Sequence, residues 1–108
     1  MAIDSVSPVH REALHRAIVR ESPNAIFLVE STSHRILEAN DATLALLGYD
    51  DPALCALRLD DIDVTPGRDL AGMLQRVVRT HNDLLGERTL RRRDGSLIPV
   101  EASANLII

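Results

Sequence analysis

The sequence contains no tryptophan and no lysine, and Phe27 and Tyr49 are its only aromatic residues. Since aromatic side chains can add little buried area, the core of this chain must be aliphatic, built from Leu, Ile, Val and Ala. All 12 basic residues are arginine, a usage that fits a G+C-rich genome, so we expect a bacterial source. The net charge of −4 argues against nucleic acid as a partner, because phosphate binding draws on a basic face.

Cysteine and long apolar runs are scarce as well. The single cysteine, Cys55, excludes a disulfide within the chain and indicates the cytoplasm. No apolar run approaches the roughly 20 residues that cross a bilayer, and Met1–Asp4 do not begin a secretory signal sequence. We expect one cytoplasmic domain without direct membrane insertion, since 108 residues fit a single core.

Motifs of catalysis and of metal binding are also missing. The chain has no Gly-x-Ser-x-Gly, Walker or Gly-x-Gly-x-x-Gly motif, and we expect no enzyme. The acidic run Asp60, Asp61 and Asp63 lacks the Gly and Glu of a calcium loop, because Pro66 and Gly72 stand at those positions. We interpret the run as helix N-caps and solvated loop residues, and we expect no metal.

The first half of the chain carries signals for one helix and one strand pair. Ser7-Pro8 has the form of a helix start and predicts an amphipathic N-terminal helix that reaches Arg20. The apolar runs Ala25–Glu30 and Arg35–Ala39 flank a turn sequence, which predicts two antiparallel strands.

Capping residues predict several helices after this strand pair. Asn40 is a suitable N-cap for a helix over Asp41–Leu47, and Gly48 suits the left-handed position that ends it. Further helical segments are expected near 50–52 and 60–61, followed by a longer helix over 68–80. The apolar stripe of the longer helix consists of Leu70, Met73, Leu74, Val77 and Val78.

From Leu84 onward the apolar pattern has a period of two. Asp94-Gly95 predicts the turn of a β-hairpin whose second arm is Leu97–Ile108. The whole pattern predicts the α+β class: an antiparallel sheet flanked by short helices and one longer helix, preceded by an N-terminal amphipathic helix. One face of the second arm carries Ile98, Val100, Ala102 and Ala104.

Three stretches in this order and spacing resemble the PAS family of sensory domains. They are Ser22–Ile26, Arg35–Asn40 continuing to Leu47-Gly48-Tyr49, and Glu87–Ser96. The resemblance implies a PAS-like sheet of five antiparallel strands whose concave face encloses a pocket together with the helices. We divide the chain into an N-terminal flanking helix, residues 1–21, and a PAS-like sensory domain, residues 22–108.

The resemblance also implies a role. PAS domains commonly serve as input modules fused to kinases, phosphatases, cyclases or transcription regulators, so we expect control of a fused effector domain in a bacterial signal-transduction protein. Many bind a small molecule, and many dimerise through the helix before the first strand. A ligand-free module for dimerisation or protein interaction is the alternative. A homodimer would use the apolar face of the first helix: Val9, Ala13, Ala17 and Ile18.

The likeness stops before the last central strand of the family, which would follow the second hairpin arm. We therefore expect two unpaired strand edges where the centre of the sheet should be. This predicts strand exchange with a second chain or a deformed sheet, and a monomer with a complete five-stranded sheet would contradict it.

Strand alternation and the resemblance together predict the lining of a pocket. Either an ordinary core fills this space, or the small side chains of Ala25, Ala102 and Ala104 leave room for an apolar molecule such as an acyl chain. The expected lining from the strands is Ala25, Phe27, Val29, Arg88, Leu90, Ile98, Val100, Ala102 and Ala104, and from the helices it is Leu44, Leu47, Leu54, Leu57, Ile62, Leu74 and Val77.

Arg88 has two possible roles in this lining. Its guanidinium could bind the carboxylate of a ligand such as a fatty acid, or it could pair with an Asp or Glu of the chain.

Neither flavin nor haem is expected. Flavin-binding relatives present a reactive cysteine in an Asn-Cys-Arg-like stretch, whereas Cys55 lies in Ala53-Leu54-Cys55-Ala56. Haem-binding relatives usually supply a His from the long helix, but residues 68–80 contain none and His81 falls just beyond them. The expected ligand is a small apolar molecule such as a fatty acid.

Overall fold

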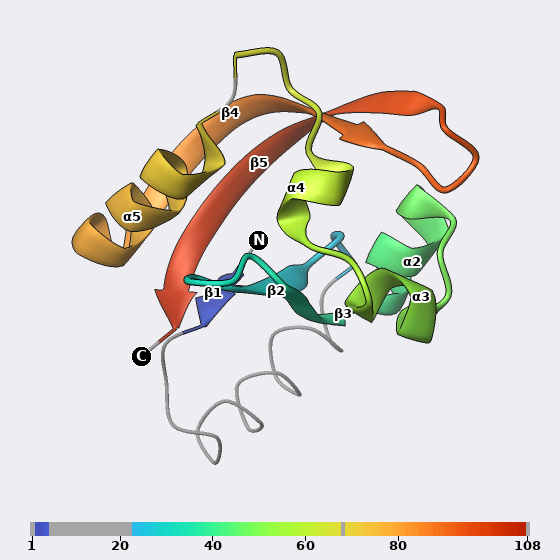
Figure 1. Cartoon of the computed structure of the whole chain (residues 1–108), viewed down its shortest axis with the longest axis horizontal. Coiled ribbons are helices and arrows are strands. Elements are labelled where there is room, and N and C mark those ends of the chain that lie inside the picture. The colour runs from blue at the N-terminus through green and yellow to red at the C-terminus, as the bar shows by residue number, and fades with distance from the viewer. Residues whose placement is uncertain (1, 5–22, 68, 108) are drawn as a thin grey trace.

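The computed structural model describes residues 2–4, 23–67 and 69–107, which form one sheet with helices on one side (Figure 1). The α+β class predicted from the sequence is confirmed. The predicted N-terminal helix and its dimer face, Val9, Ala13, Ala17 and Ile18, lie outside the described residues. In chain order the elements are β1 (Ala2–Asp4), β2 (Phe27–Glu30), β3 (Ile36–Ala39), α2 (Asp41–Leu47), α3 (Asp51–Cys55), α4 (Leu59–Ile62), α5 (Leu70–Thr80), β4 (Asn82–Arg91) and β5 (Leu97–Ile107).

The described residues build a five-stranded sheet in the order β3-β2-β1-β5-β4. β2 and β3 form one antiparallel hairpin and β4 and β5 the other, as the sequence predicts. β1 lies between the hairpins and runs parallel to its two neighbours, β2 and β5. Ile3 of β1 lies opposite Val29 of β2 and Leu106 of β5. The expectation that one chain leaves the centre of the sheet unpaired is therefore wrong. The apolar pattern of the sequence did not indicate β1, because a strand of three residues has almost no periodicity.

The caps predicted for α2, the first helix after β3, are confirmed. The side chain of Asn40 accepts a hydrogen bond from the Thr43 amide, and Gly48 ends α2 in the left-handed region at φ 81°. The longer helix, α5, begins at Leu70 and ends at Thr80, and its C-cap His81 is exposed and also left-handed. Val78, placed in the apolar stripe of this helix, is 39% exposed and lies outside the core.

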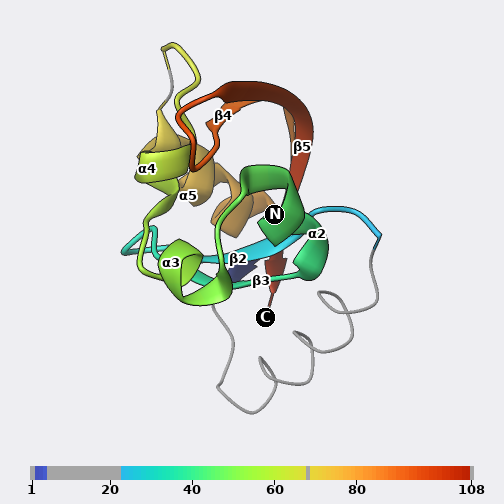
Figure 2. The same ribbon diagram turned by 90° about the vertical axis from the view of Figure 1, so that its right-hand side faces the viewer.

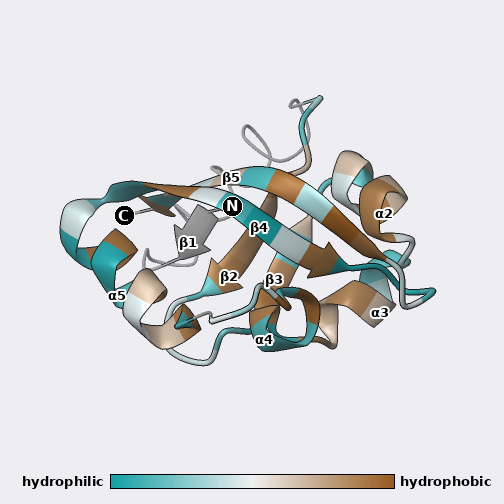
Figure 3. Cartoon of the chain, turned by 90° about the horizontal axis from the view of Figure 1, so that it is seen from above, coloured by the Kyte–Doolittle hydropathy of each residue, from teal (hydrophilic) through white to brown (hydrophobic). Residues whose placement is uncertain are grey.

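The second hairpin turns at Gly95, whose φ is 88°, and its arms pair from Arg91 opposite Leu97 onward. The two arms curve from α5 toward α2, where the Arg93 amide donates to the Leu47 carbonyl (Figures 1 and 2). Along both arms apolar and polar residues alternate, as Figure 3 shows. The prediction that apolar and polar residues alternate strictly from Leu84 onward is wrong, however, because the pairing register shifts between Leu84 and Gly86.

The core lies between the sheet and the helices and is aliphatic, as expected. Phe27, on β2, is the one aromatic side chain among the buried residues that the structure describes. The cluster consists of Phe27, Val29, Ile36, Ala39, Leu47, Leu54, Leu59, Ile62, Leu70, Met73, Leu74, Val77, Leu90 and Ala104. Within the described ranges, no helix is both long and apolar enough to cross a membrane.

Candidate functional site

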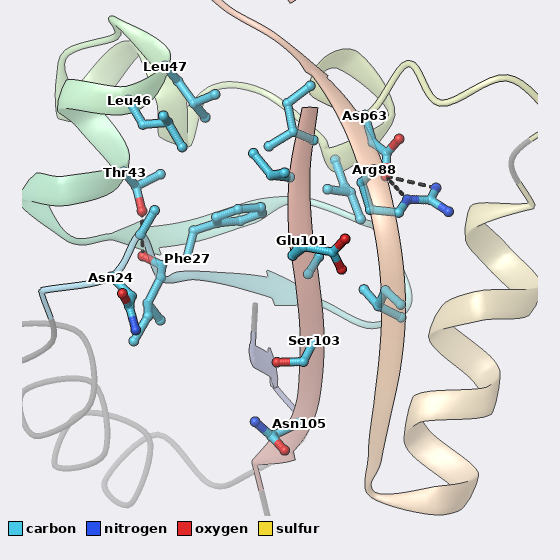
Figure 4. A pocket seen from close by; sticks show the side chains of 17 residues that line it. Asn24, Phe27, Thr43, Leu46, Leu47, Asp63, Arg88, Glu101, Ser103 and Asn105 are labelled. Carbon is cyan, nitrogen blue, oxygen red and sulfur yellow. Dashed lines mark hydrogen bonds and ion pairs between the residues drawn. The ribbon is translucent and has the colours of Figure 1, made fainter. Parts of the chain in front are cut away.

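A cavity of about 570 Å³ lies between α2, the start of β2 and the β4–β5 hairpin (Figure 4). The ring of Phe27 points from β2 toward β5, with Leu46 and Leu47 of α2 above it. The described lining residues are Asn24, Ala25, Ile26, Phe27, Thr43, Leu46, Leu47, Leu59, Asp63, Leu85, Arg88, Leu90, Val100, Glu101, Ala102, Ser103 and Asn105. Ala25 and Ala102 thus border the cavity, whereas Ala104, the third of the small residues expected there, is buried in the core.

The cavity follows the edge of β5 that faces β2. Neighbouring residues of a strand point to opposite faces, yet Val100 and Glu101 both line this cavity. β1 explains this arrangement, since it pairs only with β5 residues 105–107 and leaves the earlier part of β5 apart from β2. The cavity therefore reaches into the middle of the sheet.

A network around Asn40 holds the α2 side of the cavity in place. Its Oδ1 accepts hydrogen bonds from the amides of Ile26 and Thr43, both at 3.0 Å, and its Nδ2 donates to the Asn24 carbonyl at 2.7 Å. The Thr43 hydroxyl donates to the Ile26 carbonyl at 2.9 Å. Asn40 and Thr43 are buried, so these bonds fix the segment before β2 against the start of α2.

An ion pair between Arg88 and Asp63 lies at the other end of the cavity. Arg88 Nε and Nη2 each lie 2.9 Å from Asp63 Oδ2, and the two side chains are 14% and 4% exposed. Of the two roles open for Arg88, the structure therefore shows the pair with an acidic residue of the chain. The interpretation of Asp63 as a solvated loop residue is wrong, because its side chain is shielded from water. The residue directly follows α4, and its backbone forms a β-bridge to Leu90 of β4.

Thr65 holds the other oxygen of the same carboxylate. Asp63 Oδ1 accepts from the Thr65 amide at 3.0 Å and from its hydroxyl at 2.6 Å. The Thr65 hydroxyl oxygen in turn accepts from the Thr89 amide, and the Val64 amide donates to the Thr89 carbonyl. The loop after α4 is thus attached along β4 beside the cavity.

The structure brings together seven of the sixteen residues expected to line a pocket. These are Ala25, Phe27, Leu47, Arg88, Leu90, Val100 and Ala102. Six others are buried in the core away from the cavity: Val29, Leu54, Ile62, Leu74, Val77 and Ala104. The remaining three, Leu44, Leu57 and Ile98, are partly buried and pack against that core. Ligand contact by any of the sixteen stays a prediction.

Leu85, Thr43 and Glu101 also line the cavity, although the sequence pattern did not indicate them. Leu85 faces the core because Gly86, at φ 73°, allows a bulge, while Leu84 is 86% exposed. A glycine within a strand is a recognised sign of a bulge and could have indicated this. Glu101 lies between Val100 and Ala102, where strand alternation predicts the opposite face, and the separation of β2 from β5 brings it to the cavity.

Cys55 and His81, the residues that a flavin or haem site would call on, are not among the described lining residues of the cavity. Cys55 ends α3, and its Sγ lies 3.6 Å from the Leu37 carbonyl oxygen. Burial, together with the negative charges of Asp51 and Glu38, raises the pKa of this thiol. Within the described parts of the chain, no group of three His, Cys, Asp or Glu side chains could hold a metal ion.

Comparisons with known proteins agree with this architecture. The fold resembles a domain of a sensory box sensor histidine kinase/response regulator from Geobacter sulfurreducens, at 29% identity and a TM-score of 0.70, over 90% of this chain and 84% of that one. A PAS domain from a two-component sensor histidine kinase matches at 25% identity and a TM-score of 0.65, over 91% and 83%. The PAS domain of an HTR-like protein from Haloarcula marismortui shares the fold at 24% identity and a TM-score of 0.69, over 88% and 78%.

No curated protein matches the sequence. The family model described as PAS domain matches residues 13–88, which is more than half of the chain. With the fold and the cavity, this match identifies the chain as a member of the PAS domain family.

Proposed function

We propose that this chain is the sensory input domain of a bacterial signal-transduction protein and binds a small apolar molecule in the cavity between α2 and β5. The observation that carries the proposal is the cavity itself, since about 570 Å³ falls within the range of small-molecule sites. The side chains of Phe27, Leu47 and Val100 would contact an apolar chain, such as the acyl chain of a fatty acid. The neighbours from sensor histidine kinases support the sensory role and a fused effector domain.

The position of the cavity suggests how binding would be transmitted. The cavity touches the segment leading into β2 and the edge of β5, and these two strands flank β1. A ligand that favours one separation of β2 and β5 would shift the population of sheet arrangements, and an effector fused to the domain would respond to that shift. We extend the proposal to a cytoplasmic location, which the lone free thiol of Cys55 supports.

Native mass spectrometry of the protein as expressed tests the proposal. We expect an additional mass that is released on unfolding, or a stabilising thermal shift with apolar probes. Ala102→Leu should abolish either signal by filling the cavity wall. Ala71→Leu, the same change on an exposed face of α5, should preserve it.

Absence of any bound mass and of any probe-induced shift, in a folded wild-type protein, would contradict the proposal. A dimer without a bound molecule would favour the alternative, a dimerisation module. The expected dimer interface, formed by the apolar residues of the first helix, stays a prediction.

A further inference from the structure

We propose that Asp63 sets the ligand specificity of the cavity: by occupying Arg88, it makes the cavity select uncharged apolar molecules and reject carboxylates. This inference rests on the proposed function, because it concerns the ligand of the same cavity. It narrows the ligand class from any molecule with an acyl chain to one with an uncharged head group.

Arg88 is already paired with a carboxylate of the chain, that of Asp63. Both contacts from its guanidinium to Asp63 Oδ2 are 2.9 Å long, and both side chains are almost fully shielded from water. A ligand carboxylate that took over the guanidinium would leave Asp63 buried and unpaired. Leaving one member of a buried ion pair without its partner is strongly unfavourable. Figure 4 shows the guanidinium turned toward Asp63, on the far side of β4 from Phe27.

Asp63 is also held in place by hydrogen bonds other than those from Arg88. Its Oδ1 accepts from both the amide and the hydroxyl of Thr65, and its own amide donates to the Leu59 carbonyl at 2.8 Å. Thr65 is itself fixed to the Thr89 amide at 2.9 Å. Rotation of the carboxylate away from Arg88 would break the Thr65 contacts as well, so the pair behaves as a fixed part of the wall.

The charged side chains of the lining also disfavour an anionic ligand. Among the described lining residues the charged side chains are Asp63, Arg88 and Glu101. A ligand carboxylate would therefore be the third carboxylate beside a single guanidinium. Like charges in a partly desolvated site disfavour one another, whereas an alcohol or ester head group carries no such cost.

A matched pair of ligands tests this assignment. 1-Decanol and decanoate have the same chain and differ in the head group, and decanoate is ionised at pH 8. By calorimetric titration we expect the wild-type protein to bind 1-decanol at least about tenfold more tightly than decanoate. Asp63→Asn keeps an acceptor for Thr65 but frees the charge of Arg88, so it should reduce this ratio by at least about tenfold. Asp83→Asn makes the same change at the more exposed Arg76–Asp83 pair and should leave the ratio unchanged.

Each outcome decides a separate point. Equal affinities, or tighter binding of decanoate by the wild-type protein, would overturn the role of Asp63 while leaving the proposed function standing. Binding of neither probe would overturn both. If Asp63→Asn does not fold, Asp63→Ser, which also frees the charge of Arg88, takes its place and should show the same reduced ratio. An unchanged ratio in a folded Asp63 variant would overturn the assignment.

Discussion

Arg88 on β4 donates a hydrogen bond of 2.9 Å from Nε to Oδ2 of Asp63, a residue 25 positions earlier in the chain. This contact attaches the loop after α4 to the sheet and closes one end of the cavity. It also neutralises the positive charge of the guanidinium that would attract an anionic ligand.

Removal of one member of this pair should destabilise the fold strongly. Asp63→Ala leaves Arg88 charged, shielded from water and without its carboxylate, so we expect a loss of about 3 kcal/mol in the free energy of unfolding. Urea denaturation measures this. Asp83→Ala breaks the pair with Arg76, whose side chain is 51% exposed, and should cost less than about 1 kcal/mol. Equal costs for the two variants would contradict the buried role of Asp63.

Asn40 should be the most important capping residue of the described helices. Asn40→Ala leaves the Ile26 amide without its acceptor and removes one of the two acceptors of the Thr43 amide, and we expect a cost of at least about 2 kcal/mol in the free energy of unfolding. Asp50→Ala removes an exposed cap of α3 that binds one amide, that of Ala53, and should cost about 1 kcal/mol or less. Urea denaturation of both variants gives the comparison. Similar costs would show that the Asn40 network contributes no more than an ordinary cap.

The lowered pKa of Asp60 predicts that the free energy of unfolding falls in acid. Partial burial acts to raise its pKa, but the hydrogen bond from His34, a backbone hydrogen bond and nearby positive charge outweigh it, so the pKa lies below the ordinary 3.8. A depressed pKa contributes stability that is fully present above about 3.8 and is lost as the pH falls through the lower, folded-state value.

The measurement for Asp60 compares wild type with Asp60→Asn by urea denaturation at pH 5 and pH 3. Asp60 is 41% exposed, so we expect a difference below about 1 kcal/mol at pH 5 that shrinks at pH 3. A difference that grows toward pH 3 would contradict the assignment.

Cys55 should react slowly. Burial raises the pKa of its thiol, and so do the charges of Asp51 and Glu38, which lowers the thiolate fraction that attacks a disulfide reagent. At pH 8 we expect reaction with Ellman's reagent to be several-fold slower than in the urea-unfolded chain. Asp51→Asn should accelerate the reaction of the folded protein, and a thiol that reacts as fast folded as unfolded would contradict the raised pKa.

The parts of the fold that sequence reasoning predicted depend on local chemistry. Asn40 caps the start of α2, Gly48 caps its end, and Asp94-Gly95 forms the hairpin turn. These features were predictable because capping and turn preferences act within a few residues. The alternating face of Ile98 and Ala104 also follows from the pattern alone.

The features that the sequence did not reveal depend on contacts between distant segments. β1 pairs Ile3 with Val29 and with Leu106, and no local preference encodes such a pairing. The sequence left Arg88 either a ligand carboxylate or an Asp or Glu of the chain as partner, and its pairing with Asp63 depends on the loop after α4 lying along β4. Leu85 replaced Leu84 at the core because a single bulge reverses which face each residue occupies.

The most direct test of the central claim is a crystal structure of the protein with 10-bromo-1-decanol, whose bromine can be located by anomalous scattering. The account predicts a bromine peak inside the cavity, among Phe27, Leu47 and Val100, with the Asp63–Arg88 pair intact. A cavity closed by repacked side chains, with bromine absent or bound only on the surface, would contradict it.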